Sequence, residues 1–233
     1  MERRSWLLDE LASVGEEHLN PAYVREYDRK SGFDPDPDLA LLDRYGFTAE
    51  STLIDFGCGT GEFALAAART CRRVVAVDIS TPMLDALRRK AEQEGMKNLE
   101  IVGQGFLTYE QRGEKADFVF SRNALHHLPD FWKALALERI ARLLKPGGVL
   151  RLRDLVFSFE PHDSGPVIEA WLQTAPARPE DGWTRAELET HLRQEFSTFS
   201  WLLEPMLKRA GFEIREAAYS ESKVFAAYVC VRI

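Results

Sequence analysis

The stretch Leu53–Glu62, which reads LIDFGCGTGE, decides the fold that we expect for this chain. A short apolar run meets a carboxylate at Asp55, and the glycines Gly57, Gly59 and Gly61 then lead into an Ala-rich segment. Glycine lets the backbone turn tightly and approach a ligand that a Cβ atom would keep away. The pattern predicts a strand, a tight turn beside a ligand, and a helix.

The same alternation extends over residues 51–155. Apolar runs rich in β-branched residues predict strands at 51–56, 73–78, 99–102, 116–121 and 149–155. Such runs, separated by helices, are typical of a mostly parallel sheet with helices on both faces. Ligands of these sheets bind at the carboxyl ends of the strands, so residues there are site candidates.

Capping residues predict where the intervening helices begin and end. One helix covers 62–70, and a second begins at Thr81 as its cap, with Pro82 at the first position. A third covers 131–144 after Asp130 as its cap, and the KPGG segment at 145–148 stops it.

Two parts of the chain lie outside this core. Residues 1–50 predict a helical cap with helices at 4–18 and 22–30 and a turn at 34–37, whereas 156–204 is irregular apart from a capping box of Thr184 and Glu187. An insertion of that length is usually a lid or a binding loop. Residues 205–233 predict a helix at 205–210 and a hairpin of strands 212–219 and 224–231, within a single domain spanning 1–233.

Composition narrows the class of protein. A net charge of −7 over 233 residues argues against a nucleic-acid partner, because such partners require a broad basic surface. No apolar run approaches the ~20 residues of a membrane span, and acidic residues interrupt the start as they would not in a signal peptide. Three separated cysteines fit a reducing compartment. We expect a cytoplasmic monomer or homodimer.

The glycine-rich stretch resembles motif I of the class I S-adenosylmethionine-dependent methyltransferases, small-molecule branch. That resemblance implies a Rossmann-like, seven-stranded sheet with S-adenosylmethionine as cofactor and S-adenosylhomocysteine as product. Gly57, Cys58 and Gly59 would line the methionine part of the cofactor, and Asp55 would serve its amino group.

A dinucleotide-binding domain is the close alternative. Its fingerprint is Gly-x-Gly-x-x-Gly, whereas Gly59 is followed here by Gly61 and then Glu62. An acidic side chain at the third glycine position would obstruct helix packing and face a pyrophosphate. S-adenosylmethionine has no phosphate and tolerates Glu62.

Three further stretches extend the resemblance. Asp78 ends the second strand, where a carboxylate can accept from both ribose hydroxyls, and Ile79 and Met83 would border the adenine. Gly105 stands where many family members carry an acidic residue for the adenine amino group. The complete expected cofactor set is Tyr27, Asp55, Phe56, Gly57, Cys58, Gly59, Asp78, Ile79, Met83, Gly105, Phe106, Ser121, Arg122 and Asn123.

The acceptor side is less defined. His126 and His127, after the fourth strand, and His162 are candidate bases, although a base is needed only if the acceptor must lose a proton. Adjacent histidines with no nearby cysteine or carboxylate pair are a poor metal site, so we expect no metal. Arg153 and Asp154 could also face the acceptor, and Tyr27 is favoured over Tyr23 as a cover for the cofactor.

The identity of the acceptor stays open. Trp171, Trp183, Phe196, Phe199 and Trp201 gather aromatic surface in the variable region, which favours an apolar small molecule but also fits an ordinary core. We expect methyl transfer to an O, N or C nucleophile of a small molecule. The alternatives are a protein or RNA methyltransferase and a non-catalytic cofactor-binding partner.

Overall fold

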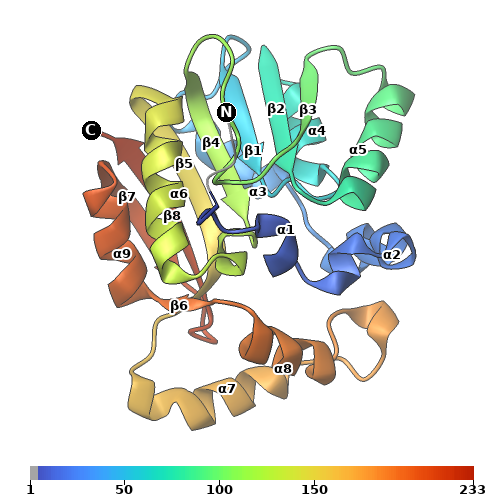
Figure 1. The fold of residues 1–233 in the computed structure, drawn as a ribbon, viewed down its shortest axis with the longest axis vertical. Helices are drawn as coiled ribbons and strands as arrows, with labels where there is room; N and C mark the ends of the chain where they lie inside the picture. Colours follow the sequence, from blue (N-terminus) through green and yellow to red (C-terminus); the bar gives the residue numbers. More distant parts are fainter. Residues whose placement is uncertain (1–4) are drawn as a thin grey trace.

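The computed structural model describes residues 5–233 and contains a central mixed sheet in the order β3-β2-β1-β4-β5-β8-β7 (Figure 1). Strands β1 to β5 are parallel, and β8 and β7 form the antiparallel hairpin at the edge. A short β6 pairs with β5 off this path. The strands are β1 Thr52–Phe56, β2 Arg73–Asp78, β3 Leu99–Gly103, β4 Ala116–Arg122, β5 Leu144–Phe157, β6 Thr198–Phe199, β7 Phe212–Tyr219 and β8 Phe225–Arg232. The predicted α/β sheet with its C-terminal hairpin is confirmed.

Helices cover both faces of the sheet because its central strands are buried on both sides. In β1, for example, Leu53 packs against one apolar cluster and Ile54 against the other, since successive side chains point to opposite faces. One face is covered by α6 Asp130–Leu143 and α9 Ser200–Arg209. The other is covered by α3 Asp36–Asp43, α4 Glu62–Ala68 and α5 Thr81–Glu94.

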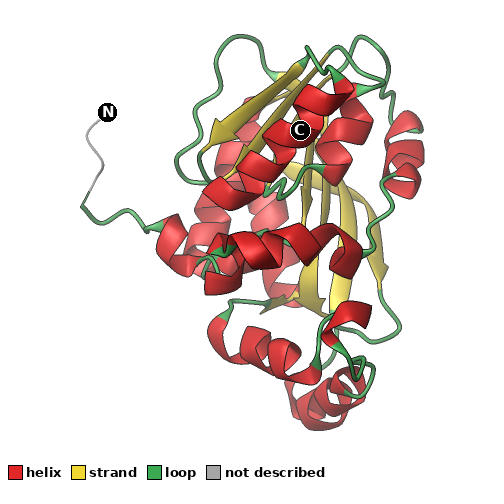
Figure 2. Ribbon diagram, turned by 90° about the vertical axis from the view of Figure 1, so that its right-hand side faces the viewer, coloured by secondary structure: helices red, strands yellow, loops and turns green. Residues whose placement is uncertain are grey.

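A separate group of helices lies across the carboxyl ends of the parallel strands (Figures 1 and 2). From the N-terminal side come α1 Glu10–Ser13, the 3-10 turn Glu16–Leu19 and α2 Pro21–Ser31. From the insertion come α7 Ser164–Leu172 and α8 Arg185–Gln194. Strand ends and these helices together enclose the region where a ligand of such a sheet would bind.

None of the helices in the described part of the chain is both long and apolar enough to pass through a bilayer.

Several predicted boundaries were wrong near capping residues. Ser80 caps α5 by accepting from the Met83 backbone N–H at 3.3 Å, so the cap is one residue earlier than Thr81. Both residue types can cap, and only the backbone conformation distinguishes them. Pro129 is the N-cap of α6, and Asp130 is its first residue. The 145–148 segment belongs to β5, which begins directly after α6.

The peripheral segments contain more helix than the sequence predicted. The turn expected at 34–37 is the start of α3, whose proline lies in the first turn, where its missing N–H costs nothing. The first expected helix, at 4–18, is two short elements over the described residues. The irregular 156–204 segment holds α7 and α8 as well as the predicted capping box, which is present. Helix α9 begins at Ser200 and includes Pro205 in its interior.

Candidate functional site

The glycine-rich turn after β1 has the geometry that its sequence predicted. Gly57, Gly59 and Gly61 have φ values of +67°, +54° and +84°. A Cβ on Gly57 would lie 2.2 Å from the Ala124 Cβ atom, and one on Gly61 would lie 2.1 Å from Leu87 Cδ1. These positions therefore require glycine both for backbone conformation and for close packing.

Two buried carboxylates flank this turn. Asp78 accepts from the backbone N–H groups of Gly59 and Ser80, each at 2.8 Å, and burial still raises its pKa. Asp55 is 2% exposed, and burial together with the charge of Asp78 raises its pKa well above the usual value. A ligand that donates hydrogen bonds or carries a positive charge would stabilise the ionised form of these buried carboxylates.

A third buried carboxylate, Glu10 of α1, was missed by sequence reasoning. It accepts from the Leu107 backbone N–H at 3.1 Å, and burial raises its pKa. Gly105 makes room for it, because a Cβ there would lie 2.3 Å from Glu10 Oε1. The acidic group absent at position 105 is thus supplied from the N-terminal segment.

A narrow first cavity of about 90 Å³ lies between these groups. Its walls include the glycine turn, the residues after β2, and the N-terminal residues Glu10, Val14 and His18. The N-terminal segment is fastened beside the cavity, because the Ser80 hydroxyl donates to the His18 carbonyl at 2.6 Å. The Tyr27 ring lies over the glycine turn, 3.9 Å from where a Cβ of Gly59 would be.

A second cavity of about 550 Å³ lies next to the first and falls within the usual size of small-molecule sites. Helices α2 and α8 roof it, and the strand ends form its floor. Trp183 joins the two sides of the roof by donating to the Tyr23 hydroxyl at 3.2 Å. The two cavities share the side chains of His18, Tyr27, Arg122, Asn123 and His127.

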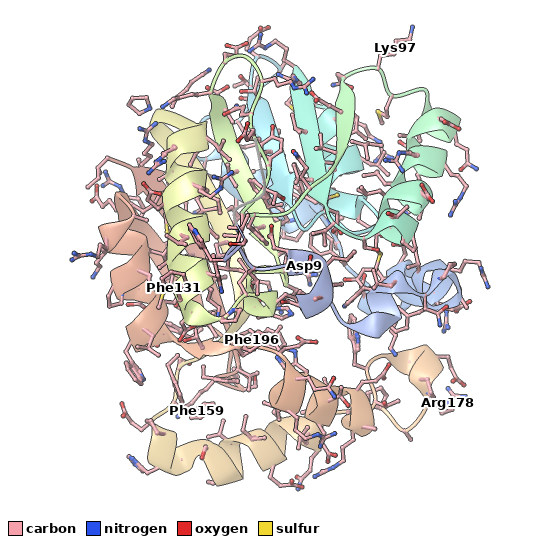
Figure 3. All side chains as sticks on the ribbon, in the orientation of Figure 1. Asp9, Lys97, Phe131, Phe159, Arg178 and Phe196 are labelled. Atoms are coloured by element: carbon pink, nitrogen blue, oxygen red, sulfur yellow. The ribbon has the colours of Figure 1, made fainter. Side chains whose placement is uncertain are left out.

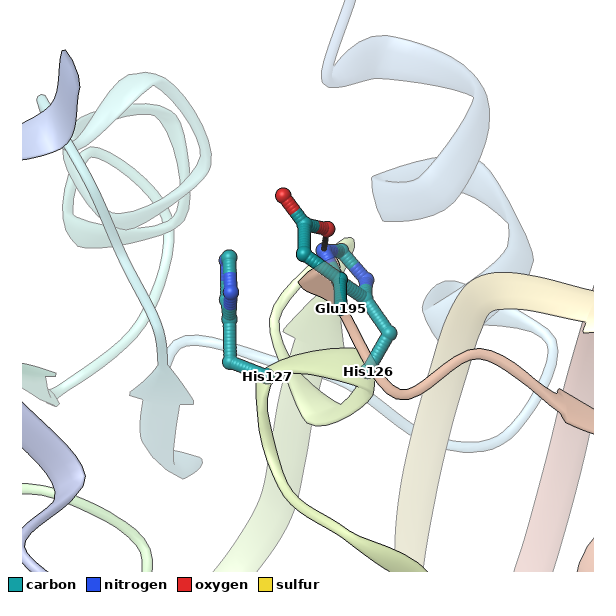
Figure 4. Close-up of side chains that lie close together, drawn as sticks. All are labelled: His126, His127 and Glu195. Atoms are coloured by element: carbon teal, nitrogen blue, oxygen red, sulfur yellow. Dashed lines mark ion pairs between the residues drawn. The ribbon is translucent and has the colours of Figure 1, made fainter. Parts of the chain in front are cut away.

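His126 joins the strand ends to the segment after α8. Its Nδ1 contacts the Asp154 carboxylate, and its Nε2 lies 3.0 Å from Glu195. Figure 4 shows the ion pair between His126 and Glu195. Burial alone would lower the pKa of His126, but Asp154 and Glu195 outweigh it and raise the pKa to about 9. Glu195 also contacts His191 of α8. At neutral pH His126 is therefore a cation between two carboxylates. It links β5 to the segment after α8, and as a protonated ring it has no lone pair with which to act as a base.

His127 has the opposite electrostatic state. Burial, followed by the charge of His126, lowers the pKa of His127 to about 3, so its ring is neutral. Its Nδ1 is buried without a hydrogen-bond partner among the described residues. It is the histidine that lines both cavities together with His18.

His126, His127 and Glu195 also offer ligand atoms within 4.8 Å of one another, a spacing that could hold a metal ion. The sequence placed no carboxylate near these histidines, and Glu195 supplies one from a distant segment. The His126 imidazolium, however, already lies between Glu195 and Asp154, so a metal ion would have to displace its proton before this ring could serve as a ligand.

Comparison with known proteins gives the family. A family model described as a methyltransferase domain matches residues 53–148. An uncharacterized methyltransferase of Geobacillus kaustophilus is 27% identical over 185 residues, which are 79% of this chain and 78% of that protein. The uncharacterized protein YafE of Escherichia coli is 35% identical over 122 residues, 52% of this chain and 55% of YafE, so the match spans about half of that relative.

A solved structure shares the fold. The structure of magnesium protoporphyrin IX methyltransferase from Synechocystis, with bound S-adenosylmethionine, has a TM-score of 0.65 and 17% identity, and covers 99% of this chain and 100% of that one. Residues 53–148 of this chain therefore match a methyltransferase domain, and the chain as a whole shares the fold of a methyltransferase that binds S-adenosylmethionine.

The residues of this methyltransferase fit the family's cofactor. A glycine turn with left-handed backbone allows close approach, and the buried carboxylates Asp55 and Asp78 can serve an amino group and ribose hydroxyls. Most of the predicted cofactor residues line the first cavity, namely Tyr27, Phe56, Gly57, Gly59, Asp78, Ile79, Met83, Gly105, Phe106, Arg122 and Asn123.

Asp55, Cys58 and Ser121 lie behind this wall rather than in it. Cys58 is half-buried and its thiol contacts the Gly59 carbonyl at 3.8 Å, while the Ser121 hydroxyl is fully buried without a partner in the described residues. Cys58 and Ser121 would have to act through neighbouring backbone, and Asp55 through its charge.

The acceptor-side candidates of the methyltransferase separate in space. His162 is exposed and contacts only Asp163, at 3.6 Å, away from both cavities. Of the predicted aromatic residues, Trp171 and Trp183 line the second cavity, whereas Phe196 and Trp201 are exposed. Figure 3 shows Phe196 and Phe159 between the sheet and helices α7 and α8, with Arg178 farther out beyond α8.

Proposed function

We propose that this methyltransferase moves a methyl group from S-adenosylmethionine to an O, N or C nucleophile of a small molecule held in the second cavity. The observation that carries the proposal is the shared wall of Tyr27, Arg122, Asn123 and His127 between the two cavities. An in-line displacement needs the nucleophile ~3–3.5 Å from the methyl carbon, and adjoining cavities with one common wall favour such an approach.

Three carboxylates would hold the cofactor. Asp78 accepts from the ribose hydroxyls, while Asp55, behind the glycine turn, stabilises the ammonium group electrostatically. Glu10 accepts from the adenine amino group, which is the role that an acidic residue at position 105 would otherwise have. The bound cofactor supplies a methyl group on a sulfonium, and the protein's task is to orient the acceptor.

His127 would orient the acceptor nucleophile. Its neutral ring lines both cavities, so a ring nitrogen turned toward them would offer a lone pair to an O–H or N–H group of the acceptor. A pKa near 3 makes it a weak base in the ligand-free protein, so we assign it hydrogen-bond positioning ahead of full proton abstraction. The roof of α2 and α8 would exclude water from the acceptor.

The roof also favours a small molecule over a protein or RNA acceptor. Trp183 and Tyr23 bridge the two helices, and Lys30 of α2 forms an ion pair with Glu187 of α8. A polymer would have to displace these contacts to reach the second cavity. A cavity blocked by the insertion would favour a protein that only binds the cofactor for a partner. In this chain the insertion leaves the second cavity open.

Calorimetry with S-adenosylhomocysteine tests the proposal first. We expect one site per chain and no comparable binding of NAD. A metabolite screen with S-adenosylmethionine should then find a small molecule that gains the mass of one methylene unit. Binding of NAD without any response to S-adenosylhomocysteine would overturn the cofactor assignment, and methylation of RNA or protein alone would overturn the acceptor class.

A further inference from the structure

Two arginines stand side by side at the floor of the second cavity. Arg122 ends β4, and its register partner on the neighbouring strand β5 is Arg153. Both side chains line the second cavity, and Arg122 also reaches the first. The Arg122 guanidinium lies 4.1 Å from the Phe33 ring centroid, and that of Arg153 lies 4.3 Å from the Phe225 centroid.

Neither guanidinium has a carboxylate partner among the side chains that the structure describes. Arg153 donates to the Asn123 amide oxygen, which is a neutral group. Arg151, two residues earlier on the same strand, shows the contrast, because it contacts Asp38 at 2.7 Å. Burial, followed by the charge of Arg122, lowers the pKa of Arg153 to about 10, so it remains charged at neutral pH.

The nearby acids are already occupied by other cations. Glu187 pairs with Lys30, and Glu195 pairs with the His126 imidazolium. Asp154, next to Arg153 in sequence, is engaged by His126. The floor therefore carries two partly desolvated positive charges that form no direct ion pair with a carboxylate among the described residues, although Asp38 and Asp154 are near enough to act on them through their charges. Such an arrangement is costly unless a ligand completes it.

We propose that Arg153, together with Arg122, binds an oxyanion of the methyl acceptor, a carboxylate or a phosphate ester. A planar guanidinium offers paired N–H donors that match the oxygens of either group. Trp171, Trp183 and Phe225 line the same cavity and would contact an apolar or aromatic body. This inference rests on the proposed function and adds the chemical class of the acceptor.

The cofactor cannot account for both arginines. Arg122 borders both cavities, so the cofactor carboxylate could lie beside it. Arg153 lines only the second cavity. The acidic groups Glu10, Asp55 and Asp78 gather at the cofactor side instead. The unpaired charges of the two halves of the site are therefore of opposite sign.

The test uses the full chain saturated with S-adenosylhomocysteine and three probes of similar size: phenylacetate, phenyl phosphate and the neutral phenylacetamide. Ligand-observed NMR titration should show that at least one anion binds about tenfold more tightly than the amide, the scale of one charge-assisted hydrogen bond. Whichever anion binds more tightly identifies the group as a carboxylate or a phosphate ester.

Variants then assign the effect to Arg153. Arg153→Met should remove the preference for the anion. Arg153→Lys keeps the charge but loses the paired N–H donors, so it should retain part of that preference. Arg89→Met, on the exposed face of α5, is the matched control and should behave as the unmodified chain. Thermal unfolding of each variant establishes that it is folded.

Three results would overturn the inference: no binding of any probe, equal binding of anions and amide, or an anion preference that survives in Arg153→Met. Weaker binding of S-adenosylhomocysteine by Arg153→Met would also overturn it, since the arginine would then serve the cofactor. If the unmodified chain fails to bind S-adenosylhomocysteine at all, the proposed function fails instead.

Discussion

At the scale of single residues, Glu10 is the contact that ties the N-terminal segment to the cofactor side. It spans 97 positions to reach the Leu107 backbone N–H, and it fills the space left by the absent side chain of Gly105. A carboxylate from the N-terminal helix α1 thus lies where an acidic side chain at position 105 would otherwise be. In this protein, binding of the adenine would depend on the docking of α1.

Glu10→Gln should therefore weaken binding of S-adenosylhomocysteine by about tenfold, because a charged acceptor is replaced by a neutral one of the same size. The unmodified chain should also prefer S-adenosylhomocysteine to S-inosylhomocysteine, which lacks the amino group, and the variant should lose that preference. Calorimetry with both ligands measures this. Glu92→Gln on exposed α5 is the control, and identical behaviour of the two variants would exclude adenine recognition by Glu10.

At the scale of elements, the contacts of His126 tether the end of α8 to β5. The pKa of His126 is raised from 6.5 to about 9, so the stabilisation is complete below about pH 6.5 and is lost as the pH rises through 9. The shift corresponds to a free energy on the order of 3 kcal/mol.

Urea unfolding of His126→Asn should reveal this tether. The stability advantage of the unmodified chain over the variant should be large near pH 6 and shrink steadily above about pH 8, because only the unmodified chain loses a proton from position 126. His162→Asn, an exposed histidine, should show no such trend. A constant difference between the unmodified chain and His126→Asn across this range would contradict the assigned charge.

The roof helices are also predicted to respond to the cofactor. Lids are drawn from the less stable parts of a structure, and α2 is held to the 179–187 segment by a few polar contacts, including Arg29 to the Glu180 carbonyl at 2.6 Å. Hydrogen exchange in Tyr23–Lys30 and in 157–183 should slow when S-adenosylhomocysteine binds. Val149–Leu155 in β5 should stay protected throughout. Equal exchange with and without a ligand that does bind would show a fixed scaffold.

At the scale of the whole molecule, the sheet was predictable and the roof was not. Strand positions follow from local apolar runs, and the capping box at Thr184 follows from a spacing of three residues, so both can be recognised from short windows of sequence. The pairing of Arg122 with Arg153 needs the sheet register, and the contact between His126 and Glu195 needs the packing of the insertion. Such contacts between distant segments have no local signal.

The family resemblance named most of the residues that line the first cavity, because many of them directly follow strands. The resemblance did not identify Glu10, because α1 lies outside the alternating core and its segment has no periodic pattern of its own. The capping error at Ser80 had a different origin, because two adjacent residues were chemically equivalent and only the backbone could decide between them.

The position of β8 between β5 and β7 has a consequence for biosynthesis. Strands β1 to β4, with the glycine turn and Asp78, leave the ribosome before β8 does, whereas a domain generally folds as a unit. Phe225, which lies beneath the Arg153 guanidinium, and the strand that pairs with β5 arrive only afterwards. A nascent chain therefore cannot complete the sheet, or the acceptor half that rests on it, until translation has passed β8.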